Sequence, residues 1–130
     1  MPKVKVNNTQ GLVQATGGGI ALFGATEAIS DTNTIAATTS LVLYTTTGAS
    51  KILSLPAVTN LETGHTIVIG HIAGSNNATL RPTPTSLRMN GVNSDPELTL
   101  TAKTAVKCIW SGSSNPGWIV IVGDASTVPA

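Results

Sequence analysis

Ionisable and aromatic side chains are both scarce in this sequence. Only 10% of its 130 residues are charged, whereas an average soluble domain has about 25%. The aromatic residues are Phe23, Tyr44, Trp110 and Trp118. We therefore expect Val, Ile, Leu and Ala to fill the core of one domain, and Thr, Ser and Asn to cover much of its surface. Such a surface suits burial against neighbouring subunits; an unusual monomer is the alternative.

The net charge of +1 argues against nucleic-acid binding, which needs clustered Lys and Arg. Lys3 and Lys5 form a small basic N-terminus, and the other bases are scattered. The segment 1–10 lacks the apolar core of a signal peptide, and the apolar run 118–122 is far too short to span a membrane. We predict synthesis in the host cytoplasm, with no membrane partner.

No catalytic motif is found, so we predict that the protein is not an enzyme and binds no cofactor. The single cysteine, Cys108, lies in an apolar run and is expected to be a packed side chain rather than a nucleophile. The glycines at 17–19 lack the Lys that follows in a phosphate-binding loop. Asp95 and Glu97, the only close pair of acids, flank Pro96 as in a solvated turn.

We predict no metal site. His65 and His71, six residues apart on an expected strand, would stand about 20 Å apart and cannot share one ion within a chain. They are expected to be surface or interface residues; a ring of one His from each subunit is the alternative. Calcium binding by Asn93, Asp95 and Glu97 would lack the ligands of a dedicated loop.

Short, Thr-rich alternating runs separated by turn residues extend from Ser40 to Val122. No run shows a sustained helical period. Asn90-Gly91 predicts a type I′ turn, and Pro82 and Pro84 are expected to interrupt strand pairing. About eight to ten strands at this spacing predict an all-β fold, a β-sandwich or jelly-roll-like barrel of short antiparallel strands.

Residues 1–39 differ from the sandwich domain expected at 40–130. Val4 and Val6 alternate with lysines, which predicts a short edge strand, and three glycines follow at 17–19. We interpret 1–39 as an extended N-terminal arm that becomes ordered against a partner. An ordinary first pair of strands is the alternative.

Trp118 opens the expected last strand after the polar loop that contains Asn115. An exposed Trp at this position could stack on a sugar ring. The commoner role is to cap the end of a β core with its N–H bonded outward.

Three segments carry a resemblance to bacteriophage virion proteins: Leu-Ser-Leu-Pro-Ala at 53–57, Gly-His-Thr-Ile-Val-Ile at 64–69 and Gly-Trp-Ile-Val at 117–120. Together with the polar turn between them, they are similar to a layout in tail-fibre modules and small capsid decoration (cement) proteins. The resemblance covers about residues 40–122. It implies a β-rich homotrimer on the outside of a virion.

The absence of shaft repeats and coiled coils favours a decoration protein, which would stabilise the capsid across joints of the major capsid protein. Residues 1–24 are expected to contact the capsid, with Lys3, Lys5 and Phe23 as anchors. The alternative is a trimeric tail-fibre or carbohydrate-binding module that uses Trp118 and Asn115.

Overall fold

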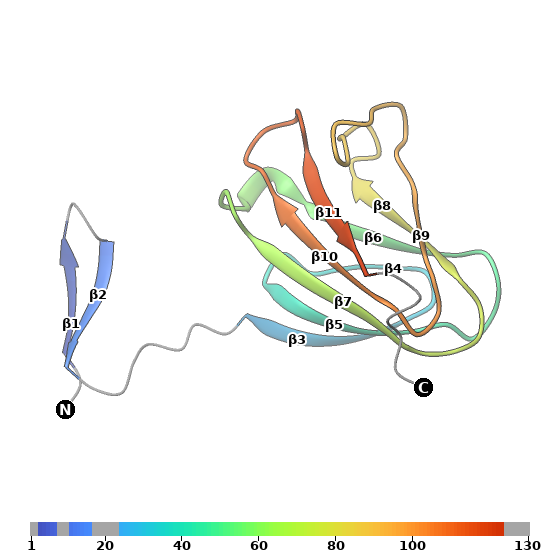
Figure 1. Ribbon diagram of the computed structural model, residues 1–130, viewed down its shortest axis with the longest axis horizontal. Helices are drawn as coiled ribbons and strands as arrows, with labels where there is room; N and C mark the ends of the chain where they lie inside the picture. The colour runs from blue at the N-terminus through green and yellow to red at the C-terminus, as the bar shows by residue number, and fades with distance from the viewer. Residues whose placement is uncertain (1–2, 8–10, 17–23, 124–130) are drawn as a thin grey trace.

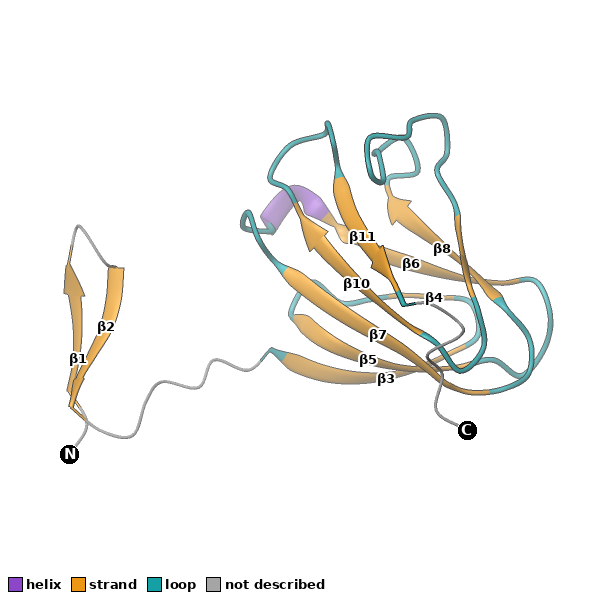
Figure 2. Cartoon of the chain, viewed as in Figure 1, coloured by secondary structure: helices purple, strands orange, loops and turns teal. Residues whose placement is uncertain are grey.

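A computed structural model describes residues 3–7, 11–16 and 24–123. The protein is all-β, as predicted, and two sheets stack as a sandwich (Figure 1). The strands are β1 Lys3–Asn7, β2 Gly11–Thr16, β3 Ala25–Ser30, β4 Asn33–Thr34, β5 Thr39–Thr45, β6 Lys51–Ala57, β7 Thr66–Ala73, β8 Ala78–Thr83, β9 Leu98–Leu100, β10 Ala105–Trp110 and β11 Trp118–Val122. A 3₁₀ turn, Val58–Asn60, follows β6 (Figure 2).

One sheet has five strands in the order β11-β10-β7-β5-β3, and the other has four in the order β4-β6-β8-β9. Both end in edge strands, so neither closes into a barrel. The hairpin of β1 and β2 forms a two-stranded sheet of its own, with Val6 opposite Leu12.

The prediction of antiparallel pairing was wrong for half of the sandwich. β3, β5 and β7 are parallel neighbours in one sheet, and β4, β6 and β8 are parallel neighbours in the other. From β3 to β8 the chain places successive strands in alternate sheets, so strands of one sheet are two elements apart and run in the same direction. Antiparallel pairs then add β9, β10 and β11.

The sandwich also begins earlier than predicted. β3 pairs with β5 and β4 pairs with β6, so residues 25–39 belong to the sandwich rather than to an arm. In this segment Ile29 and Ile35 are buried in the core. The alternation of apolar and polar residues is weak in the sequence of β3, because only one residue of this strand is buried.

Inward-facing aliphatic residues of both sheets form one core. Val42, Ile67 and Ile69 of the five-stranded sheet belong to the same buried cluster as Leu53 and Leu80 of the four-stranded sheet. The rest of the cluster is Ile29, Ile35, Tyr44, Leu55, Ala78, Met89, Leu100, Val106, Cys108, Trp110, Trp118 and Val120. Burial of this apolar surface is the main favourable term in the stability of the sandwich.

The two prolines expected to interrupt pairing differ in outcome. Pro82 is buried within β8, where the β6–β8 register shifts between Ser54 and Ala57, and Pro84 lies after the strand. A third proline, Pro56, lies inside β6. The shift accommodates both Pro56 and Pro82, because proline has no N–H for the ladder.

The predicted turn at Asn90-Gly91 is confirmed, with φ angles of 50° and 80°. It bridges Met89 and Val92, whose N–H groups each donate to the other's carbonyl at 3.2 and 2.9 Å. The Asn90 side chain also bonds the backbone of Val120, accepting from its N–H at 2.8 Å and donating to its carbonyl at 3.0 Å. Asn90 thus takes the place of a neighbouring strand along the outer edge of β11.

We predict that Asn90→Gly lowers the free energy of unfolding by about 2 kcal/mol, because it leaves the N–H and carbonyl of Val120 without partners. Glycine keeps the positive φ, so backbone strain is not introduced. Asn93→Gly in the same loop is the matched control, since Asn93 is exposed and its cost reflects glycine entropy alone. Urea denaturation measures both; equal losses in the two variants would contradict the role of the Asn90 bonds.

Candidate interaction surface

The outer face of the five-stranded sheet is largely apolar from β5 to β11. One row of residues in register crosses four strands: Ile121 lies opposite Lys107, Lys107 opposite Val68, and Val68 opposite Leu41. Thr26 of β3 extends this row to the edge of the sheet. The row therefore places three large aliphatic side chains and one ammonium group side by side.

Neighbouring rows have the same character. Ile109 lies opposite Ile119, and Gly70 has Leu43 on one side and Ala105 on the other. We define the apolar face by Leu41, Leu43, Val68, Ile109, Ile119 and Ile121. Leu41, Val68 and Ile121 are 38%, 37% and 55% exposed, which is unusual for adjacent large aliphatic residues.

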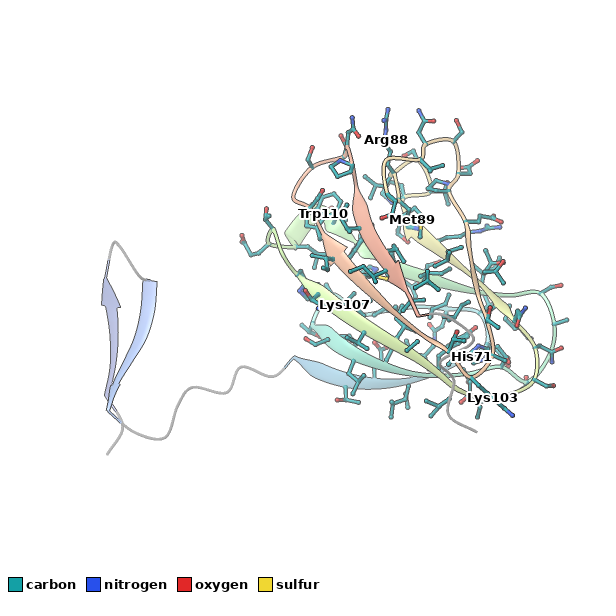
Figure 3. All side chains as sticks on the ribbon, in the orientation of Figure 1. His71, Arg88, Met89, Lys103, Lys107 and Trp110 are labelled. Carbon is teal, nitrogen blue, oxygen red and sulfur yellow. The ribbon has the colours of Figure 1, made fainter. Side chains whose placement is uncertain are left out.

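Lys107 is the single ionisable residue on the outer face of these five described strands (Figure 3). Glu27 lies on the other side of β3, the side of the buried Ile29. Its carboxylate accepts from Ala36 N–H at 3.1 Å and from the Thr39 hydroxyl at 2.7 Å. The apolar face is thus nearly free of charge.

The outer face of the four-stranded sheet is polar by comparison. Thr79 lies opposite Thr99, and Ser54 lies opposite Arg81. Arg81 forms an ion pair with Glu97. The outer face of the five-stranded sheet is therefore the candidate interaction surface.

The expectation that both histidines lie at a surface was wrong for His71. His71 is buried, with its ring 5.2 Å from that of Tyr44 (Figure 3). Its Nε2 lies 3.1 Å from the Thr46 hydroxyl, which donates to the carbonyl of Asn76 at 2.9 Å. Since that hydroxyl has one proton, Nε2 of His71 donates to it. His65 is half-buried, just before β7.

The glycan contact proposed for Trp118 is also wrong, because Trp118 is fully buried. Its ring packs 5.7 Å from that of Trp110. Its indole N–H has no partner among the described residues, so the expected outward hydrogen bond is absent too. Gly117, at φ 78°, leaves room for the carbonyl of Arg88, which accepts from the backbone N–H of Trp118 at 2.9 Å. Asn115 is exposed in the preceding loop.

The three proposed capsid anchors are only partly covered by the structure. Phe23 lies outside the described residues. Lys3 and Lys5 lie in β1, where the backbone pairs with β2.

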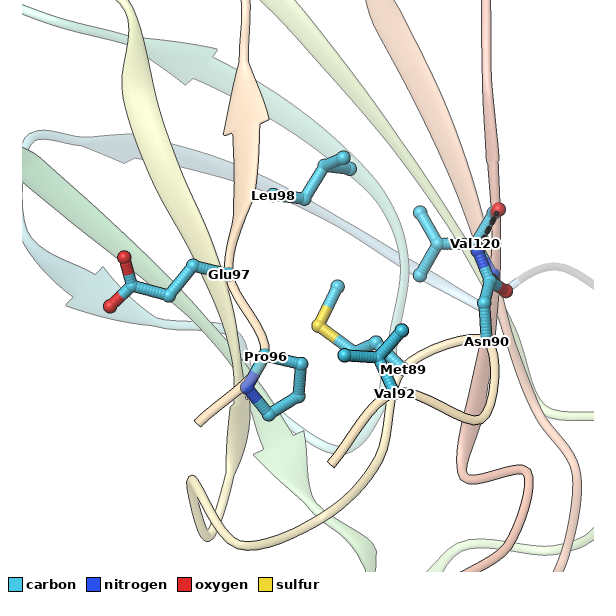
Figure 4. A pocket seen from close by; sticks show the side chains of 7 residues that line it. All are labelled: Met89, Asn90, Val92, Pro96, Glu97, Leu98 and Val120. Atoms are coloured by element: carbon cyan, nitrogen blue, oxygen red, sulfur yellow. Dashed lines mark hydrogen bonds between the residues drawn. The ribbon is translucent and has the colours of Figure 1, made fainter. Parts of the chain in front are cut away.

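Within residues 24–123 no group of three His, Cys, Asp or Glu side chains comes together as a metal site. Glu97 is paired with Arg81, and Asp95 lies at φ 55° in an exposed turn. A cavity of about 170 Å³ adjoins this turn (Figure 4). Its lining is mainly apolar: Met89, Asn90, Val92, Pro96, Glu97, Leu98 and Val120.

Comparison with known proteins identifies no relative: no protein-family model matches the chain, and no curated protein matches its sequence. In the part of the chain that the structure describes, no helix has the length and apolar character needed to cross a membrane.

Burial raises the pKa of the Cys108 thiol to about 12. We predict that iodoacetamide at pH 8 leaves Cys108 unmodified in the folded protein and alkylates it fully in guanidinium. A guanidinium concentration of about 6 M is enough to unfold most domains. Intact-mass spectrometry reads the result. Rapid alkylation under native conditions would show that the thiol is accessible, against its buried position in β10.

Two hydrogen bonds from Thr47 lower the pKa of Asp31. The bond from the Thr47 hydroxyl at 2.6 Å has the larger effect, the bond from its backbone N–H at 2.8 Å the next, and the charge of Lys51 contributes less. A lowered folded-state pKa stabilises the fold above the unfolded value, about 3.9, and this contribution is lost as the pH falls through the folded pKa.

We therefore predict that Asp31→Asn reduces the loss of stability between about pH 5 and pH 2. Asn tolerates the positive φ of this position. Asp95→Asn is the control, because Asp95 accepts no hydrogen bond from the described residues. Thermal melts across this range test the prediction; identical pH profiles for Asp31→Asn and the unaltered protein would contradict it.

Proposed function

We propose that the protein is a structural component of a phage virion, a capsid decoration protein that binds as a homotrimer across joints of the major capsid protein. The observation that carries the proposal is the exposed, nearly uncharged apolar face on a rigid sandwich. The resemblance of segments 53–57, 64–69 and 117–120 to phage virion proteins supplies the class of partner.

The chemistry of the described residues fits an assembly role better than a catalytic one. The buried titratable groups are held within the core: Cys108 is fully enclosed and His71 is bonded to Thr46. The ionisable groups at the surface include two ion pairs, Arg81 with Glu97 and Lys51 with Asp31. These groups support folding and surface solvation.

Stabilisation of the capsid would be mechanical. A protein that binds the assembled shell and not free coat subunits stabilises the shell by mass action, by about 2.7 kcal/mol per site at a free concentration of 100 times Kd. The proposed capsid contact is the N-terminal segment 1–24, with Lys3, Lys5 and Phe23 as anchors. Two lysines near the end of an arm suit an acidic patch on the coat protein.

The direct test uses expanded, empty heads of the phage whose genome encodes this chain. We predict that the purified protein co-sediments with these heads, raises their melting temperature in calorimetry and does not bind unassembled coat protein. Absence of binding to expanded heads, or equal binding to free coat protein, would overturn the proposal.

The arm contact is tested by charge reversal. We predict that Lys5→Glu weakens binding to heads by about tenfold, since an attractive contact becomes repulsive, and tenfold corresponds to about 1.4 kcal/mol. Lys103→Glu, an equal charge change on an exposed turn of the sandwich, is the matched control. If both variants weaken binding equally, the lysines act through net charge rather than as anchors.

A further inference from the structure

The cavity of about 170 Å³ lies at the end strands of the two sheets (Figure 4). β11 is the end strand of the five-stranded sheet, and β9 is the end strand of the four-stranded sheet. Val120 of β11 and Leu98 of β9 both line the cavity, together with Met89 from the loop between β8 and β9. The cavity is therefore formed by both layers of the sandwich and not by one loop alone.

The walls of this cavity are fixed by polar bonds outside it. On one side the Asn90 amide bonds both backbone groups of Val120, and the backbone N–H of Asn90 donates to the carbonyl of Trp118 at 2.8 Å. On the other side Glu97 forms its ion pair with Arg81. A site whose walls are fixed before binding loses little conformational entropy when a ligand enters.

The chemistry of the lining favours an uncharged, apolar ligand. Met89, Pro96 and Val120 are buried, and Leu98 packs against the core. The two polar lining residues already have the partners described above. A polar group that entered the cavity would lose hydrogen bonds to water and recover few of them.

The volume of the cavity sets the size of the ligand. An engineered apolar cavity of about 150 Å³ in another protein stays dry and binds benzene or xenon. The cavity of this protein is close to that size. It is smaller than the pockets of about 300–1,000 Å³ that hold drug-sized molecules. It therefore accommodates a single ring.

Met89 favours an aromatic ring over an aliphatic one. A thioether makes favourable contacts with aromatic rings, and its unbranched side chain adapts to the shape of a ligand. Figure 4 shows the Met89 side chain among Pro96, Leu98 and Val120. Val92, which also lines the cavity, is 60% exposed, so the cavity opens to solvent beside an apolar side chain.

We propose that this cavity binds one uncharged aromatic ring, in contact with Met89, Leu98 and Val120. Such a ring has two possible sources, a free aromatic compound and the Phe side chain of a bound protein segment. The inference goes beyond the proposed function and does not rest on it.

Methionine-methyl NMR on the full chain provides the first test, with toluene as the probe. The sequence has two methionines, and the Met89 resonance is identified by its loss in Met89→Leu. Toluene is expected to shift this resonance through its ring current, with a dissociation constant of about 1 mM. A Met89 resonance that stays in place up to the solubility limit of toluene would overturn the proposal.

A variant that fills the cavity provides the second test. Leu98→Phe places a ring of the chain itself in the cavity and is expected to weaken toluene binding at least tenfold. Its melting temperature should be unchanged or higher, because filling a cavity adds contacts. Leu41→Phe, the same substitution on the outer face of the five-stranded sheet, is the matched control and should bind toluene as the unaltered chain does.

Equal toluene binding by folded Leu98→Phe and Leu41→Phe would show that the ring does not occupy this cavity. The shift of the Met89 resonance in the unaltered chain tests the site even if Leu98→Phe fails to fold. Cyclohexane tests the choice of an aromatic ring. It is expected to bind about threefold more weakly than toluene, since it lacks the sulfur–aromatic contact. Tighter binding of cyclohexane would contradict that choice.

The two sources of the ring are separated by a second probe, N-acetyl-phenylalanine amide, which carries its ring on a peptide backbone. Binding of both probes would assign the cavity to a protein side chain. Binding of toluene alone would assign it to a free aromatic compound. Failure of both would overturn the site. None of these experiments uses phage heads, so their outcome is separate from that of the proposed function.

Discussion

The packing of two sheets on one dry aliphatic core is the constraint on which the rest of the structure depends. Between β3 and β8 the chain places successive strands in alternate sheets, so every connection there joins one sheet to the other. Val42, Ile69 and Leu53 are fully buried at this contact. Successive side chains of a strand point to opposite sides of the sheet. Each residue that faces the core therefore places its neighbours on the outer face.

The two outer faces obey the same geometry and differ in chemistry. The four-stranded sheet has Thr79 and an Arg81–Glu97 ion pair outside, as expected of a face in water. The five-stranded sheet instead has aliphatic rows there, interrupted by Lys107. The packing of the core fixes which residues face outward, but it does not fix their polarity.

The outer edge of β11 is partly protected. Asn90 bonds both backbone groups of Val120 and occupies part of the free edge of β11. Covering backbone groups in this way blocks strand addition at this part of the edge.

The alternating pattern determined the all-β class, the strands near 41–45 and 118–122, and the turn at Asn90-Gly91, because each depends on neighbouring residues alone. Tertiary structure alone decided that half of the strands pair in parallel and that β3 belongs to the sandwich. It also decided the burial of His71 and Trp118 and the formation of the apolar face. Alternation assigns residues to faces but does not name the adjacent strand. The rows of the apolar face are built from strands far apart in sequence, so their meeting is set by long-range pairing.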